Sequence, residues 1–329
     1  MAFSATGGVA WVVPSPRSPV RLVIPLPLAL KSANAWLFPG ERPALVDCGV
    51  GTTEGRAALL AGLRAAKVDP AQLRLFVTHG HIDHAGNAAV LHRDHGVELQ
   101  APREEAPFVE TFRRDAARRS DAFARALERH GAPPEAVASS RERAGHMDAW
   151  MEDVPIGKPL RDGERLLLGG VEVTAHITPG HTPGSTVFLT ADNDLLSGDT
   201  LLEHITSNAI ELVDRDHGRY AQYLRTLEGL RRFVGAQVLP GHHDPFPLTD
   251  ALLDGHLEKH NRRTAKVLAA LDAPRTAWEL LPRVLPHLAH DQVFLGMCEM
   301  VGHLHMLEIE GKAKVTTDAT TGVRRFSRT

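Results

Sequence analysis

The sequence contains little cysteine and lacks a long apolar run. Its 329 residues include only two cysteines, Cys48 and Cys298, which are too few for a disulfide framework. A reduced compartment is the simpler interpretation, and we expect a cytoplasmic protein. No stretch approaches the ~20 consecutive apolar residues of a transmembrane helix, so we expect no membrane partner. The apolar segment at 8–13 is also too short for the core of a secretion signal.

Aromatic residues are few, and neither sign of charge is in large excess. The chain has 37 lysines and arginines against 40 aspartates and glutamates, a formal net charge of −3. This balance gives no general attraction to nucleic acid or to an anionic membrane. Aromatic residues make up 5% of the chain, so few side chains are available to stack on bases. Nucleic acid is therefore a disfavoured partner. At 43% hydrophobic residues the chain can bury a large core, in one domain or two.

Histidine, in contrast, is frequent, with 19 residues. Three of them and one carboxylate lie within six residues, in the segment Thr78-His79-Gly80-His81-Ile82-Asp83-His84. This segment follows an apolar run at 73–77 that is typical of a buried strand. His79 and His81 are two residues apart on a turn, so both rings can reach the same ion. Imidazole nitrogen and carboxylate oxygen suit Zn²⁺ first, with Fe or Mn as alternatives.

Three further donors occur downstream in similar settings. His181, Asp199 and His242 each directly follow a glycine at the end of an apolar run. A lone His-x-His pattern is a weak signal, because it often belongs to an ordinary polar turn. The repetition of a donor after a strand-end glycine favours a metal site instead.

These residues resemble the motifs of the metallo-β-lactamase superfamily, over about residues 20–250. The resemblance implies an α/β protein, an αββα sandwich with its ligands on loops at one edge. It also implies two divalent metal ions. The implied ligands are His79, His81 and His181 for one ion, Asp83, His84 and His242 for the second, and Asp199 as a bridge between them. In such proteins an aspartate at the position of Asp47 supports the metal loop; a plain turn residue is the alternative.

The hydrophobic pattern predicts the remaining organisation. Strands are expected at 20–25, 34–38, 43–49 and 97–101, followed later by a hairpin at 165–168 and 171–177. We assign residues 1–250 to the catalytic domain. Within it, residues 103–155 are charged and alanine-rich, with a break at 131–134 between two helical stretches, and are predicted to form an inserted helical cap beside the metal edge. A surface insertion without a role in the pocket is the alternative.

Beyond residue 250 the pattern changes to helices. Helices are predicted at 252–271, at 276–284 with a threonine N-cap, and at about 289–310, followed by a hairpin of 312–316 with 322–327. Three helices and a hairpin look like a winged-helix module, so residues 251–329 are assigned to a winged-helix-like C-terminal domain. It is expected to form a wall of the substrate site or a homodimer contact. His303 and His305 lie two residues apart on a helix and cannot share a metal ion.

The ligand set predicts a hydrolase. A hydroxide held between the two ions would attack a carbonyl, and Asp83 would orient that hydroxide or accept its proton. The resemblance is to the glyoxalase II-like branch, so we expect a small-molecule acyl ester or thioester as substrate. The alternatives are a lactonase or β-lactamase-type amide hydrolase and a single-strand-specific endoribonuclease, since the basic run at 259–263 resembles a segment of one. A non-catalytic role is disfavoured because all seven ligand positions are filled.

Overall fold

The computed structural model describes residues 18–209, 212, 217–289 and 292–329. Its first sheet has six strands in chain order: β1 (Val20–Pro25), β2 (Ser32–Phe38), β3 (Ala44–Val46), β4 (Arg74–Phe76), β5 (Leu99–Pro102) and β6 (Ile156–Leu160). β1 to β3 pair antiparallel, and β3 to β6 pair parallel. The predicted apolar segment at 8–13 lies outside the described residues.

The second sheet also has six strands. They follow the order β12 (Phe246–Pro247), β11 (Gln237–Pro240), β10 (Asp194–Gly198), β9 (Thr186–Thr190), β8 (Val171–Ile177) and β7 (Arg165–Leu168). β10 and β11 are parallel, and the other neighbours are antiparallel. The predicted hairpin at 165–168 and 171–177 is confirmed by β7 and β8. The short strands β6 and β12 were not predicted.

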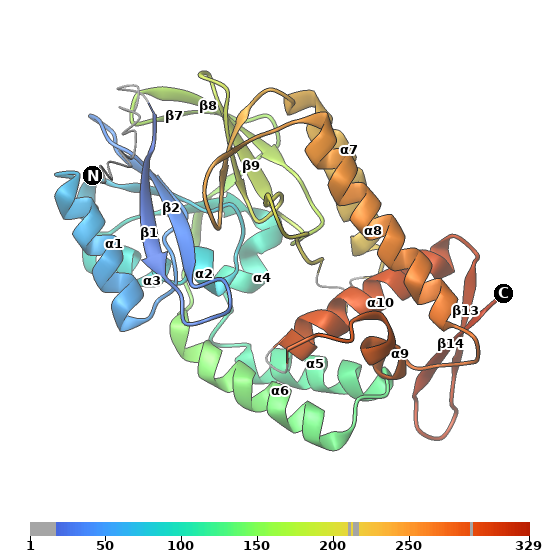
Figure 1. Cartoon of the computed structure of the whole chain (residues 1–329). Coiled ribbons are helices and arrows are strands. Elements are labelled where there is room, and N and C mark those ends of the chain that lie inside the picture. The colour runs from blue at the N-terminus through green and yellow to red at the C-terminus, as the bar shows by residue number, and fades with distance from the viewer. Residues whose placement is uncertain (1–17, 210–211, 213–216, 290–291) are drawn as a thin grey trace, which may run out of the picture.

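The two sheets face each other and helices cover their outer faces. One apolar cluster joins residues of both sheets, with Phe76 of β4 edge-on to Phe188 of β9 at a ring separation of 6.3 Å. α1 (Thr53–Ala65) and α3 (Ala88–His95) pack on the outer face of the first sheet, and α7 (Arg219–Gly229) packs on that of the second. The αββα sandwich is therefore confirmed (Figure 1).

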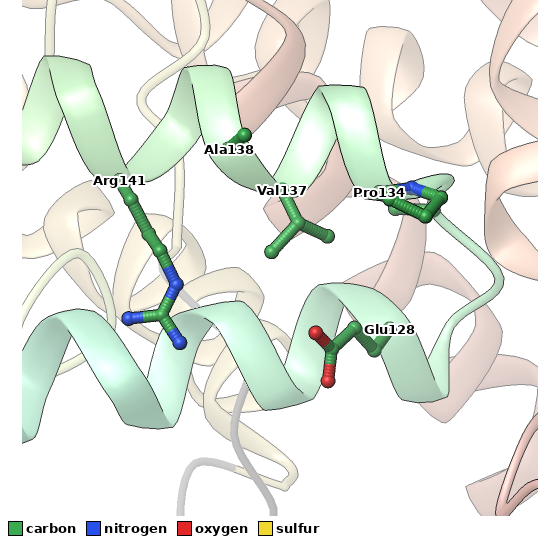
Figure 2. A pocket seen from close by; sticks show the side chains of 6 residues that line it. Glu128, Pro134, Val137, Ala138 and Arg141 are labelled. Carbon is green, nitrogen blue, oxygen red and sulfur yellow. The ribbon is translucent and has the colours of Figure 1, made fainter.

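The segment between β5 and β6 is helical, as predicted. It contains the short helix α4 (Ala106–Val109) and the longer helices α5 (Ala116–Arg129) and α6 (Pro134–Met147), so the predicted break at 131–134 is confirmed. α5 and α6 lie side by side, and Figure 2 shows Glu128 of α5 and Arg141 of α6 pointing into a cavity of 260 Å³ between them. We call residues 103–155 the insertion.

The C-terminal part contains the predicted three helices and hairpin. These are α8 (Asp250–Ala270), α9 (Ala277–Val284), α10 (Val293–Ile309) and the pair β13 (Ala313–Thr317) and β14 (Arg324–Arg328). Thr276 caps α9 in a capping box with Glu279, which explains where that helix begins. The winged-helix class and the domain boundary at 250 stay predictions.

One apolar cluster unites the insertion with this C-terminal part. Leu127 of α5 and Val137 of α6 belong to the same buried cluster as Leu280 of α9 and Val301 and Leu304 of α10. The long helices of the insertion thus pack mainly on the C-terminal helices, which lie beside them in Figure 1. Its beginning, around α4, and its end, at Trp150, reach the edge of the sandwich where the predicted ligands lie.

None of the helices in the described ranges combines the length and apolarity that a bilayer crossing requires. Cys48 and Cys298 both lie in the described part, are buried, and are not joined to each other.

Candidate metal centre

The predicted ligands gather on loops at one edge of the sandwich. The segment 79–84 follows β4, His181 follows β8, Asp199 follows β10 and His242 follows β11. All seven come together, in three overlapping groups whose ligating atoms lie within 4.8 Å of one another: His79, His81 and His181; His79, His84 and Asp199; Asp83, His84 and His242. The donor types suit a divalent ion. Which ion they hold, and how many, stays a prediction.

Three ring nitrogens meet in the first group. His79 Nε2 lies 3.0 Å from His81 Nδ1 and 3.2 Å from His181 Nε2, and His81 Nδ1 lies 3.0 Å from His181 Nε2. A hydrogen bond needs one donor and one acceptor, so three mutually adjacent nitrogens cannot all pair with one another. A shared cation satisfies all three at once. Nitrogens of a tetrahedral Zn²⁺ site lie about 3.3–3.4 Å apart, close to the observed spacing.

The outer nitrogens show which lone pairs face the centre. The Thr78 hydroxyl donates to the Asp47 carboxylate at 2.9 Å, so its oxygen accepts from His79 Nδ1 at 3.1 Å. His181 Nδ1 donates to the Asn208 carbonyl oxygen at 2.7 Å. A neutral imidazole has one N–H, so Nε2 of His79 and Nε2 of His181 both present lone pairs. These lone pairs repel each other unless a cation lies between them.

Asp83, His84 and His242 form the second group. His84 Nδ1 donates to Asp47 at 2.8 Å and His242 Nδ1 donates to the Ser32 carbonyl at 2.6 Å, which turns both Nε2 atoms toward Asp83. The His242 Nε2 to Asp83 Oδ2 distance is 3.4 Å. Among the described residues, both Nε2 atoms are buried without a hydrogen-bond partner. Buried polar atoms of this kind are costly, and a second ion would satisfy them.

Asp199 faces both groups with different oxygens. Its Oδ1 lies 3.4 Å from His84 Nε2 and 3.5 Å from His242 Nε2, and its Oδ2 lies 3.8 Å from His181 Nε2. Within the part of the chain that the structure describes, Oδ1 is buried and accepts no hydrogen bond. This is the placement that a bridging carboxylate needs, as the resemblance implied.

The two groups differ in charge in the metal-free protein. Burial lowers the pKa of all three rings of the first group, that of His81 to about 3. Burial acts in the same direction on the second group, but the neighbouring carboxylates, Asp199 above all, outweigh it. They raise the pKa of His242 to about 10 and that of His84 well above its usual value. At neutral pH the first three rings are neutral, and His84 and His242 are imidazolium ions beside carboxylates.

Metal binding to the second group is therefore expected to release protons. A ring must lose its proton before the nitrogen can coordinate, so this group should release about two protons per ion at pH 7, and the rings of the first group almost none. Because the pKa values of the second group are raised, its apparent affinity should increase with pH up to about 10, the pKa of His242. Calorimetric Zn²⁺ titrations in two buffers of different ionisation enthalpy measure these protons. Equal release in both binding steps would contradict the assignment.

Asp47 hydrogen-bonds to the loop that carries His79 to His84. This confirms that it supports the ligand loop and is not a plain turn residue. Its Oδ1 accepts from the Thr78 backbone N–H at 2.7 Å and its Oδ2 accepts from His84 Nδ1 at 2.8 Å. The carboxylate is 1% exposed, so these contacts are shielded from water. The adjacent Cys48 is buried and its thiol donates to the His84 carbonyl at 3.2 Å. Burial raises the pKa of that thiol, so Cys48 is a small buried residue and not a nucleophile.

Glycine is required directly before several ligands because the backbone there lies very close to atoms of neighbouring loops. A Cβ at Gly241 would lie 2.6 Å from Asp199 Oδ1 and 2.6 Å from His84 Cε1, directly in the donor cluster. Gly198 has a φ of +50°, and a Cβ there would lie 2.4 Å from Thr78 Oγ1. The backbone of the ligand loops comes too close to the donors for any side chain.

Glu105 contacts two of the ligand loops, although the sequence did not single it out. It is fully buried at the start of the insertion and accepts three hydrogen bonds. Its Oε2 accepts from the Gly80 N–H at 2.7 Å, and its Oε1 accepts from the Thr182 hydroxyl at 2.7 Å and from the Gly184 N–H at 2.6 Å. One carboxylate thus joins the loop of His79 and His81 to the loop of His181. The sequence does not distinguish Glu105 from the adjacent Glu104, which is the same residue type but is exposed.

Replacing Glu105 with glutamine is expected to destabilise the protein by about 2 kcal/mol and to weaken metal binding. The amide keeps one oxygen but presents an NH₂ group to donors, so at least one buried hydrogen bond is lost. Urea unfolding and metal content after dialysis measure the two effects. The Glu104→Gln variant removes the same charge from an exposed neighbour and should match the wild type. If both variants behaved alike, the proposed link between the loops would be wrong.

Two further features of the sequence lie near these loops or on the C-terminal helices. His243, which directly follows the predicted ligand His242, has an exposed side chain, and its carbonyl oxygen accepts from Asn34 at 2.8 Å. The basic run at 259–263 is divided between the surface and the interior. Lys259 and Arg262 are exposed, Arg262 in an ion pair with Glu258, whereas Arg263 pairs with Glu299 and His260 is buried. The nuclease alternative stays a prediction.

Comparison with known proteins agrees with the fold and the donor cluster. Residues 29–242 match the Metallo-beta-lactamase superfamily, and residues 264–329 match the Metallo-beta-lactamase-like, C-terminal domain family. The chain belongs to the metallo-β-lactamase superfamily. The family and the clustered donors make it a metallo-hydrolase with His and Asp side chains able to hold metal.

Individual relatives share much of the chain. It is similar to the probable metallo-hydrolase YqjP of Bacillus subtilis (strain 168), at 27% identity over 299 residues, covering 88% of this chain and 92% of that protein. The metallo-beta-lactamase family protein TTHA1429 from Thermus thermophilus superimposes with a TM-score of 0.81 at 28% identity, covering 95% of this chain and 99% of that one. A hydroxyacylglutathione hydrolase of Bartonella quintana (strain Toulouse) is 31% identical over 126 residues, 38% of this chain and 44% of that protein.

Proposed function

We propose that this protein hydrolyses acyl ester or thioester bonds of small molecules with the help of two divalent metal ions, Zn²⁺ in the first instance. The observation that carries the proposal is Asp199, which faces His181 with one oxygen and both His84 and His242 with the other. Two adjacent donor groups that share a carboxylate suit two ions better than one. When bound, such ions supply a Lewis acid for the carbonyl oxygen and activate a water molecule at neutral pH.

The similarity to the hydroxyacylglutathione hydrolase supports the choice of bond. That name describes cleavage of an acyl group from glutathione, and the shared segment covers 38% of this chain. The donor cluster itself is compatible with other carbonyl substrates, so lactones and amides are the comparison substrates for a test.

Asp83 is the residue that we assign to the attacking water. Its side chain is 14% exposed, against 0% for His84 and His242. Within the second group, Asp83 is therefore the side chain that water reaches. Burial raises its pKa, but the charges of His84 and His242 outweigh this and lower it to about 2. When these rings lose their protons to bind metal, the ions would replace that positive charge, so the carboxylate would stay a weak base at neutral pH. We therefore assign Asp83 to orienting the water by accepting a hydrogen bond, more than to removing its proton.

The insertion and the C-terminal part are proposed to form the walls of the substrate site. The ring of Phe108, in α4, stands edge-on to His81 at 5.9 Å. On the other side, Asn208 accepts from His181 and donates its side-chain N–H to the Leu295 carbonyl of α10 at 2.8 Å. Both segments thus contact the loops of the ligands, and we propose that residues 103–155 act as a cap and residues 251–329 as a separate wall domain.

The test is thiol release from acyl thioesters of glutathione, coenzyme A and N-acetylcysteamine, with a lactone and an oxygen ester as comparisons. The protein is loaded with Zn²⁺, Mn²⁺ or Fe²⁺, and the Asp83→Ala variant serves as the blank. Metal-dependent release that falls at least about a hundredfold in the variant is expected. No release from any thioester or ester, with two bound metals verified by elemental analysis, would refute the proposal.

A further inference from the structure

A second cavity, of 420 Å³, lies beside the candidate metal centre on the face of α5 that does not contact α6. Phe108 belongs to its lining and, as described above, also stands against His81. The contact is close, because a Cβ at Gly80 would lie 2.6 Å from Phe108 Cβ. One end of this cavity therefore adjoins the loop of His79 and His81.

The lining of this cavity is strongly positive. Among the residues that line it, four are arginines, namely Arg118, Arg119, Arg125 and Arg129, and one, Asp115, is acidic. Positions 118, 122, 125 and 129 recur at the spacing of one helix face, and three of these four are arginine. The cavity between α5 and α6 differs, because its charged lining residues are one glutamate and one arginine (Figure 2). The positive charge is thus concentrated on the face of α5 near the metal centre.

These arginines are not all committed to holding the fold. Arg119 is, because it donates to Asp148 at 2.8 Å and to the Phe112 carbonyl at 2.9 Å. Within the described ranges, the ion-pair partner of Arg118 is the partly exposed Asp115 three residues earlier in the chain, a contact of little energetic value. Arg125 is exposed and, among the residues of the described ranges, has no ion-pair partner. Guanidinium groups without strong partners are available to a ligand.

We propose that this cavity binds a phosphate group of the acyl carrier, so that the preferred substrates are thioesters of a coenzyme A type and not of glutathione. The inference rests on the proposed function. A guanidinium fork matches a phosphate with two parallel hydrogen bonds, and several forks around one cavity suit a group of high negative charge. Coenzyme A carries three phosphates, whereas glutathione carries two carboxylates and an ammonium. Phe123, which also lines the cavity, offers an apolar face to the rest of the carrier.

The test uses the Arg118→Ala/Arg125→Ala double variant of the full, metal-loaded chain. Both side chains are exposed, so folding should be preserved. Arg114→Ala/Arg141→Ala is the matched control, because it removes two exposed arginines of the same insertion that do not line this cavity. Calorimetry with coenzyme A, with adenosine 3′,5′-bisphosphate and with glutathione measures binding without any turnover.

The expected result is that the wild type binds coenzyme A and the bisphosphate but not glutathione. The cavity variant should lose about tenfold or more in affinity while the control does not. The KM of a coenzyme A thioester should rise by the same factor, and that of the N-acetylcysteamine thioester should stay unchanged. Absence of coenzyme A binding, or equal binding by both variants, would overturn the inference and leave the proposed hydrolase intact. Arginine-dependent binding without cleavage of any thioester or ester would support the phosphate site in this cavity and refute the proposed function.

Discussion

Replacing Asp199 with alanine is expected to lower kcat/KM of the metal-loaded protein by about a thousandfold. The carboxylate is the one group that faces the His181 side with Oδ2 and the His84 and His242 side with Oδ1. Its removal takes away a negatively charged ligand that faces both groups, so both groups should lose affinity for metal, even though the pKa values of His84 and His242 would fall as well. Elemental analysis should show less than the wild-type metal content after dialysis.

Two comparison variants sharpen this result. Asp199→Asn keeps an oxygen in place but loses the charge, so its activity should lie between that of alanine and that of the wild type. Asp192→Ala removes an equal charge from the exposed turn between β9 and β10 and should retain full activity. Wild-type metal content and near-normal activity in Asp199→Ala would mean that the two groups do not share this carboxylate.

A charge placed in the cluster between the insertion and the C-terminal helices is expected to destabilise the protein by more than about 4 kcal/mol. Leu304 of α10 is 0% exposed and belongs to the cluster that also contains Leu127 and Val137. In Leu304→Asp the carboxylate would have no partner there. Because Glu105, near the start of the insertion, holds two ligand loops, the variant should also lose bound metal and aggregate on mild heating.

Ile309→Asp is the matched control on the same helix. Ile309 is 53% exposed, so this variant should unfold within about 0.5 kcal/mol of the wild type. Urea unfolding and metal content measure both variants. If Leu304→Asp unfolded in two transitions and still held its metal after the first transition, the C-terminal part would be an independent unit. The metal centre would then not depend on it.

The prediction of the donor residues depended on local sequence properties. An apolar run followed by a glycine and a donor marks the end of a strand, and this pattern stands before His181, Asp199 and His242. The strands β7 and β8 were predicted within their observed bounds for the same reason, since two alternating runs flank Gly169 and Gly170. β6 was missed because Gly157 and Pro159 lower its strand propensity, and only its pairing with β5 makes it a strand.

Other features came from contacts between residues far apart in the sequence. Glu104 and Glu105 are adjacent and chemically equal, yet one is exposed and the other joins two ligand loops. Likewise, the arginine spacing on α5 is compatible with a solvated face. That the cavity lined by these arginines lies near the metal centre follows only from the packing of Phe108 against His81.

The sequence by itself therefore indicated the candidate donors, because a donor after a strand-end glycine is a short-range pattern, and the resemblance of these motifs to a family implied the sandwich and the grouping of the donors. The tertiary structure alone decided which nitrogen of each ring faces the centre and which charged side chains surround the donors. Those properties depend on burial and on partners more than a hundred residues away, such as the pairing of His79 with His181, and no local pattern encodes them.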